Sequence, residues 1–109
     1  GELQDAATAI STFAKDMKKP VGKHVKGTDA LKVAAKSLNG ELSSLADTSK
    51  TLASRIRSGK PASAEARQMM DTVRRIESLL KTEGMPGEVA TAWQEGSKSI
   101  SKIKQAFAL

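Results

Sequence analysis

Residues 31–56, LKVAAKSLNGELSSLADTSKTLASRI, decide the fold of this chain. Apolar and small side chains recur in this stretch at alternating steps of four and three, which places them on one face of an α-helix. The positions are Leu31, Ala35, Leu38, Leu42, Leu45, Ser49, Leu52 and Ile56. The Asn39-Gly40 pair does not shift the register between Leu38 and Leu42, so we predict one uninterrupted helix.

The ends of this helix are marked by capping residues. Thr28 can accept a backbone N–H as an N-cap, and Gly59 suits the left-handed position that follows a helix, which predicts a helix over 28–58. Pro20 and Gly22 are expected to stop an earlier helix, and Gly84 and Pro86 a later one. The three further predicted helices cover 2–19, 61 or 63 to 83, and 87 to 109.

Each of these helices carries its own apolar face. The inward positions are Leu3, Ala6, Ile10, Phe13 and Met17 in the first, Ala66, Met69 or Met70, Val73, Ile76 and Leu80 in the third, and Val89, Trp93, Gly96, Ile100, Ile103 and Phe107 in the fourth. Short connections between the later helices favour antiparallel neighbours. The sequence predicts one all-α domain over 1–109, an antiparallel up-down-up-down four-helix bundle with a longer second helix and a Gly/Lys-rich first connection.

Composition narrows the classes of function. The chain has 109 residues, one histidine, no cysteine and no tyrosine, so it offers few groups for acid–base or nucleophilic chemistry. We therefore expect no enzymatic activity and no cofactor. No apolar run approaches the ~20 residues of a transmembrane segment, which favours a soluble domain. The composition, which is rich in alanine, serine, threonine and lysine, favours an exported protein, periplasmic or secreted, over a cytoplasmic one. The oligomeric state stays open.

Positive charge is concentrated near the first connection, Val21 to Gly27. Seven lysines and two aspartates lie between Lys15 and Lys36, a local charge of +5 in a chain of net charge +6. A basic end attracts anions, and the free amides at the start of the next helix add to this attraction. The predicted partner or anion site consists of Lys18, Lys19, Lys23, His24, Lys26 and Thr28. A second basic group is expected at the other end, from Lys50, Arg55, Arg57, Lys60, Lys102 and Lys104.

These features predict a noncatalytic module that binds a protein partner or an anionic surface. The sequence does not favour a nucleic acid, because Phe13, Trp93 and Phe107 all fall on inward positions and leave no exposed ring for a base to stack on. The simpler interpretation of the lysines is that they keep a small bundle soluble.

The alternative is a bundle that binds a small ligand or a metal ion. A large ring at Trp93 and no side chain at Gly96, on the same face, can leave a pocket between them, although close packing is the usual outcome. Met17, His24 and Met85 are expected at one end, where thioethers and an imidazole suit copper(I). Methionines on apolar faces more often fill gaps in the core.

Overall fold

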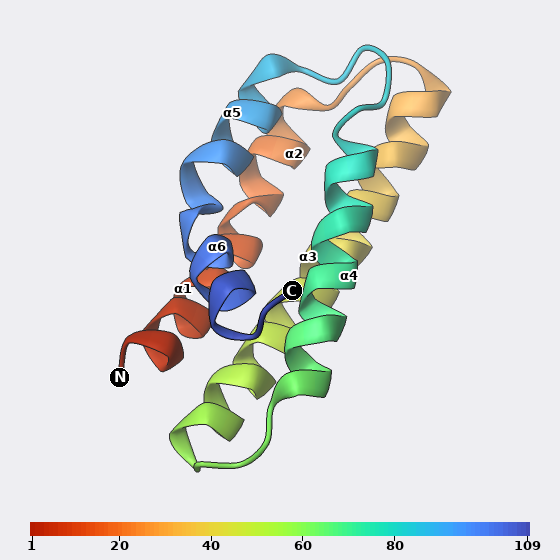
Figure 1. Cartoon of the computed structure of the whole chain (residues 1–109). Coiled ribbons are helices and arrows are strands. Elements are labelled where there is room, and N and C mark those ends of the chain that lie inside the picture. Colours follow the sequence, from red (N-terminus) through yellow and green to blue (C-terminus); the bar gives the residue numbers. More distant parts are fainter.

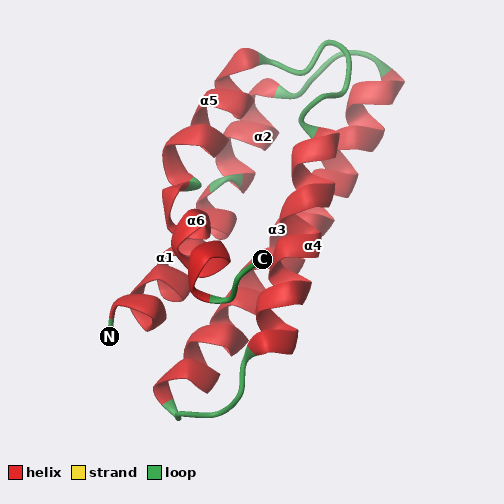
Figure 2. Cartoon of the chain, in the orientation of Figure 1, coloured by secondary structure: helices red, strands yellow, loops and turns green.

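The computed structural model describes residues 1–109 and is entirely helical, without a strand (Figures 1 and 2). The molecule is elongated, with principal extents of 46 × 20 × 19 Å. No helix combines the length and apolarity needed to cross a bilayer. The helices are α1 (Glu2–Asp16), α2 (Lys18–His24), α3 (Asp29–Arg57), α4 (Ser63–Leu79), α5 (Gly87–Gly96) and α6 (Lys98–Ala106).

The long helix α3 matches the expectation from its apolar face, and the Asn39-Gly40 pair lies inside it without a break. At its start, the Thr28 side chain accepts a hydrogen bond from the Leu31 backbone N–H over 3.3 Å. At its end, Gly59 adopts a positive φ of 69°, and the Lys60 N–H donates to the Arg55 carbonyl. This Schellman arrangement closes the helix as the glycine position predicts.

The turn after α3 leads into α4, which lies antiparallel to α3 (Figure 1). The α4 helix ends at Leu79, four residues before the expected end, because residues 80–85 fold into turns that end the helix before Gly84 and Pro86. Gly84 itself has a positive φ of 83°. The remaining helices lie along this hairpin: α1 packs along α3, α6 packs on α1, and α2 and α5 lie side by side at the opposite end from the α3–α4 turn (Figure 1).

The prediction that Pro20 and Gly22 stop the first helix, leaving His24 in a loop, is wrong. The chain bends at Met17 and resumes as α2, in which Pro20 and Gly22 are helical and His24 is the last residue. Pro20 falls in the first turn of α2, where a missing N–H breaks no bond within the helix. The predicted Gly/Lys-rich connection is therefore reduced to residues 25–28, of which Val25 is buried.

The predicted final helix, 87 to 109, is also interrupted. It bends at Ser97 and divides into α5 and α6, yet Val89 and Trp93 in the first part and Ile100 and Ile103 in the second are all buried. The bend lies beside the one at Met17, and both appear as short loops next to each other in Figure 2. Between them the ring of Phe13 packs directly on the backbone of Gly96. The space left by the missing side chain at Gly96 is thus occupied by the ring of Phe13.

One continuous core joins all six helices. Almost every inward position expected from the sequence is buried or packs against this core, and both Met69 and Met70 are buried. Three hydroxyl residues, Ser11, Ser49 and Thr72, are buried with it, and the Thr72 hydroxyl donates to the Gln68 carbonyl within α4. Ser11 donates to the Ala46 carbonyl over 2.8 Å and ties α1 to α3, whereas Ser49 Oγ has no hydrogen-bond partner. Val33 on α3 is the one large apolar side chain that is well exposed.

Candidate binding surfaces

The basic segment of the sequence lies on the outside of α2 and on the connection that follows it. Lys19 and Lys23 are exposed four residues apart, and Lys26 is exposed just beyond the end of α2. Their backbone is held in place by Val21 and Val25, which are buried in the core. The short helix and the residues that follow it, anchored by Val21 and Val25, therefore present three lysines to solvent.

Lys18 does not share this position. Its ammonium group donates to the hydroxyl of Ser43, which lies midway along α3. Lys18 therefore crosses from α2 to the middle of the molecule and is separated from the other lysines that the sequence grouped with it. The exposed lysines of the predicted site that have no hydrogen-bond partner in the protein are Lys19, Lys23 and Lys26.

None of the lysines in this part of the chain has an acidic partner. The five ion pairs of the molecule all involve other groups. They are His24–Glu88, Arg55–Glu65, Arg74–Asp71, Arg75–Glu41 and Lys102–Glu2. The charge of +5 between Lys15 and Lys36 is consequently not offset by contacts with the rest of the protein.

Two members of the predicted anion site have structural roles. Thr28 caps α3 with its hydroxyl, and Asp29 occupies the first turn of the same helix, where it already places a negative charge by the free amides. His24 lies at the end of α2 with its Nδ1 3.7 Å from a carboxylate oxygen of Glu88, the second residue of α5. These contacts join the ends of neighbouring helices.

The three residues considered for copper are not brought together. Met17 is 2% exposed in the core, and Met85 is partly buried against that core. Met17 precedes His24 by seven residues, which corresponds to roughly 10 Å along the axis of a helix. No group of three or more histidine and acidic side chains is arranged to hold a metal ion.

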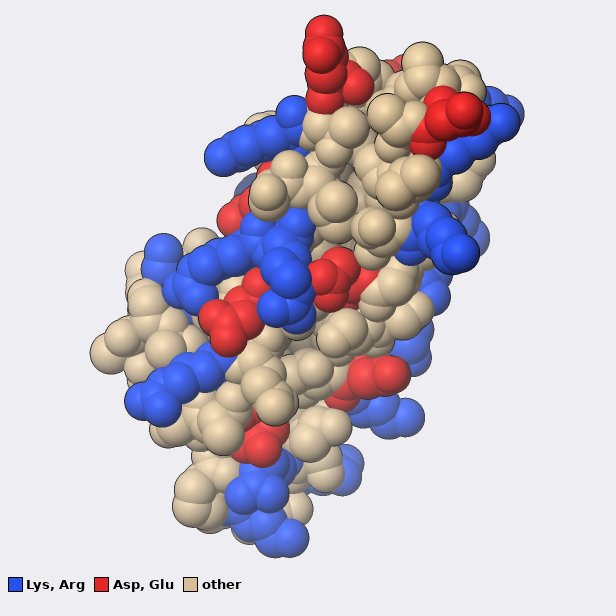
Figure 3. Space-filling view, turned by 90° about the vertical axis from the view of Figure 1, so that its right-hand side faces the viewer, with Lys and Arg blue, Asp and Glu red and all other residues tan.

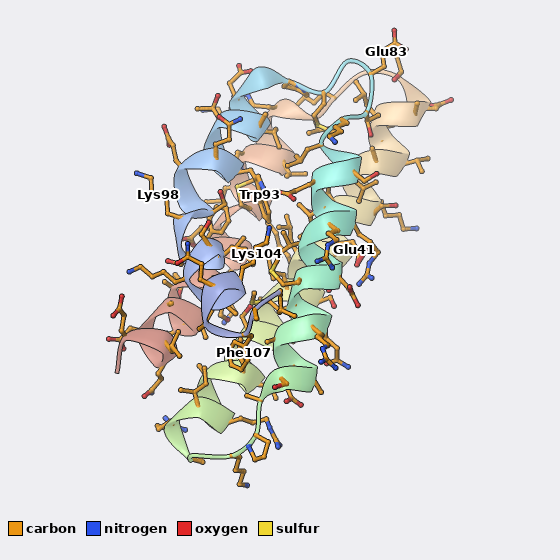
Figure 4. All side chains as sticks on the ribbon, in the orientation of Figure 1. Glu41, Glu83, Trp93, Lys98, Lys104 and Phe107 are labelled. Atoms are coloured by element: carbon orange, nitrogen blue, oxygen red, sulfur yellow. The ribbon has the colours of Figure 1, made fainter.

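Trp93 is 4% exposed and packs on Phe13, with ring centroids 5.2 Å apart. Its indole N–H donates to a carboxylate oxygen of Glu77 on α4 over 3.3 Å. An open crevice of about 430 Å³ lies between α4 and α5, and Gly96 is not among the residues that line it. Trp93 lies beside this crevice, between the two helices in Figure 4. The other residues that line the crevice are Glu77, Leu80, Lys81, Ala90, Gln94 and Ser97.

The second basic group is only partly assembled. Lys50, Arg55 and Lys60 line one depression at the α3–α4 turn, and Arg57 lies in the last turn of α3. Lys102 instead pairs with Glu2, and Lys104 lies midway along the molecule in Figure 4. The depression also contains hydroxyl groups that the sequence analysis did not consider. These are Thr51, Ser54 and Ser58, and their spacing of three and four residues, which places side chains on one side of a helix, could have revealed them in the sequence.

No protein-family model, no curated protein and no solved structure matches this chain. Its function must therefore be inferred from the chemistry of its surface.

Proposed function

We propose that this chain is a noncatalytic interaction module that engages an acidic protein partner or an anionic surface through Lys19, Lys23 and Lys26. In this proposal the scaffold is an up-down-up-down four-helix bundle, in which α1 with α2, and α5 with α6, act as two bent rods beside α3 and α4. The single observation that carries the proposal is the absence of any acidic partner for the lysines between Lys15 and Lys36.

A group of like charges without counterions within the protein attracts an external anion. Three exposed ammonium groups on one short stretch, over buried Val21 and Val25, provide such a group on a supported backbone. Lysine ammonium groups act as mobile point charges, which suits an acidic surface of irregular shape better than one fixed geometry. Such binding is expected to weaken strongly as salt is added, because exposed charges are screened.

The test uses two probes, poly-L-glutamate for an acidic protein surface, and phosphatidylcholine vesicles with and without phosphatidylserine for an anionic membrane. Changing Lys19, Lys23 and Lys26 together to Ser should abolish binding to at least one anionic probe. The matched control changes Lys81, Lys98 and Lys104 to Ser, which removes the same charge from exposed positions elsewhere. Equal loss in both variants, or no binding by the unaltered protein at low salt, would refute the proposal.

The crevice beside Trp93 favours a second candidate, a bundle that binds a small ligand. Part of its lining is apolar, and the Glu77 carboxylate lies at the indole N–H. Titration with small amphiphilic amines, followed by Trp fluorescence, tests this candidate. Binding in such a crevice should respond much less to salt than binding through exposed lysines. An unchanged fluorescence spectrum with every amine would exclude it.

A further inference from the structure

The depression at the α3–α4 turn is lined only by cationic and hydroxyl side chains. It measures about 410 Å³, and its lining contains neither an acidic nor an apolar residue. In Figure 3 the lower end of the molecule, where α3 turns into α4, carries a group of blue Lys and Arg atoms. The lining residues are Lys50, Thr51, Ser54, Arg55, Ser58 and Lys60.

Backbone geometry brings these side chains to one place. Lys50, Ser54 and Ser58 follow one another at four-residue intervals, so they share one face at the end of α3. The left-handed conformation of Gly59 then turns the chain back, and Lys60 N–H binds the Arg55 carbonyl over 2.9 Å. Lys60 is thereby returned to the face that Lys50 and Ser54 occupy.

Arg55 is held in a fixed orientation within this group. Its Nε donates to the Pro61 carbonyl over 2.6 Å and lies 3.2 Å from a carboxylate oxygen of Glu65. Its two terminal nitrogens make no hydrogen bond within the protein, since both polar contacts of the guanidinium are at Nε. A guanidinium group fixed through Nε presents its remaining N–H groups as a planar fork, the geometry that matches the oxygens of a phosphate.

Most of the remaining donors of the depression are also free, the exception being the Thr51 hydroxyl, which donates to the Asp47 carbonyl over 3.1 Å. The hydroxyls of Ser54 and Ser58 make no side-chain hydrogen bond, and neither Lys50 nor Lys60 forms an ion pair. Three of the carbonyl groups at this helix end, those of residues 54, 55 and 56, accept from the amides of residues 58, 60 and 59. The lining therefore supplies donors, and the Glu65 carboxylate lies at the Nε side of Arg55.

We propose that this depression is a binding site for a small tetrahedral oxyanion, namely phosphate or a phosphate monoester. The Arg55 fork would take two oxygens, the Ser54 and Ser58 hydroxyls would donate to the others, and Lys50 and Lys60 would neutralise the charge. This site shares no residue with the lysines of the proposed function, and either proposal can fail alone.

The test follows the backbone amide NMR spectrum of the ¹⁵N-labelled protein during titration with sodium phosphate, against sodium chloride at the same ionic strength. Phosphate should shift the amides of residues 54–60 saturably, and chloride should not. Lys50→Gln with Lys60→Gln should weaken phosphate binding about tenfold or more, because hydrogen bonds to a charged group are the stronger kind. The matched control, Lys19→Gln with Lys23→Gln, removes the same charge and should leave the affinity unchanged.

A second variant, Ser54→Ala with Ser58→Ala, separates specific binding from simple attraction, since it weakens phosphate binding without changing the charge. Unchanged signals from α1 and α6 confirm that each variant is folded. Phosphatidic-acid vesicles distinguish the source: sedimentation that the Lys50/Lys60 variant loses assigns the site to a lipid headgroup, and shifts with free phosphate alone assign it to a soluble ligand. No response to either probe, or equal responses in all variants, overturns the proposal.

Discussion

Replacing Gly96 by Ala tests the contact between the two bent parts of the molecule. A Cβ atom at this position would lie 2.0 Å from Cε1, 2.1 Å from Cδ1 and 2.8 Å from Cγ of Phe13. Carbon atoms in contact prefer about 3.5–4.0 Å, so the ring must move by more than an ångström. The ring also packs on Trp93, which restricts where it can go.

The magnitude follows from two opposed effects. Forcing an extra carbon into a packed interior destabilises a protein by about 1–3 kcal/mol. Alanine in place of glycine within a helix returns about 0.5–1 kcal/mol. Overpacking is the larger effect, so we expect Gly96→Ala to lower the free energy of unfolding. Each kcal/mol lost corresponds to a fall in Tm of about 4–8 °C for a domain of this size.

The assay is urea denaturation followed by circular dichroism, with Gly40→Ala as the matched control. Gly40 lies within α3 and has nothing within 4 Å of its virtual Cβ, so this change should stabilise the protein by about 0.5–1 kcal/mol. In a Phe13→Ala background, Gly96→Ala should lose its penalty, because the clashing ring is gone. If Gly96→Ala stabilises the protein as Gly40→Ala does, the close approach of Phe13 is refuted.

Four further substitutions have expected signs that the same denaturation assay can check. Ser49→Ala should stabilise the protein by about 1 kcal/mol, because it removes a fully buried hydroxyl that has no hydrogen-bond partner. Ser11→Ala should destabilise the protein by about 0.5–1.5 kcal/mol, because it breaks the hydrogen bond to the Ala46 carbonyl. Equal effects of the two substitutions would contradict this reasoning. Thr28→Ala should cost about 1 kcal/mol through loss of the N-cap of α3, and no change would mean that the cap is not formed in solution. Trp93→Ala should cost about 3–5 kcal/mol, and a shift near zero would place the ring outside the core.

The sequence predicted the long helix and most of the core because both depend on local, periodic information. The steps of three and four from Leu31 to Ile56 define α3 without reference to any other helix. Thr28 and Gly59 mark its ends through their own backbone bonds. Burial followed the apolar faces, because each amphipathic helix must cover its stripe against another.

The bends at Met17 and Ser97 were not predictable in the same way. In a continuous helix that begins near residue 2, Pro20 would remove a backbone hydrogen bond and is therefore predicted to end the helix. Because the chain bends at Met17 and a new helix starts there, Pro20 lies in the first turn of α2, where no such bond is lost. The bends lie where Phe13 meets Gly96, a contact between residues 83 positions apart. Nothing in the periodicity of either segment reports such a contact.

The candidate sites likewise contain residues that the sequence alone predicts and residues whose positions depend on how the helices pack. The exposed lysines of α2 were identified by charge density alone, which is a property of the sequence. Lys18 and Lys104 were misplaced because their positions depend on which helix lies opposite them. The oxyanion depression needs a turn that returns Lys60 to the face of Lys50, and this follows from the bond between Lys60 and Arg55.

The bends at Met17 and Ser97 divide the molecule into parts that are expected to differ in the free energy of local unfolding. The α2 helix buries one residue and α5 two, against nine in α3. Segments with few enclosed side chains separate from a protein at lower free energy than its centre, and they do so as cooperative units. We therefore expect the end formed by α2 and α5 to open at a lower free energy than the α3–α4 hairpin. A partner that binds the lysines of α2 would also stabilise the closed state of that end. Its binding should therefore slow hydrogen exchange of the backbone amides in α5, even without direct contact with α5.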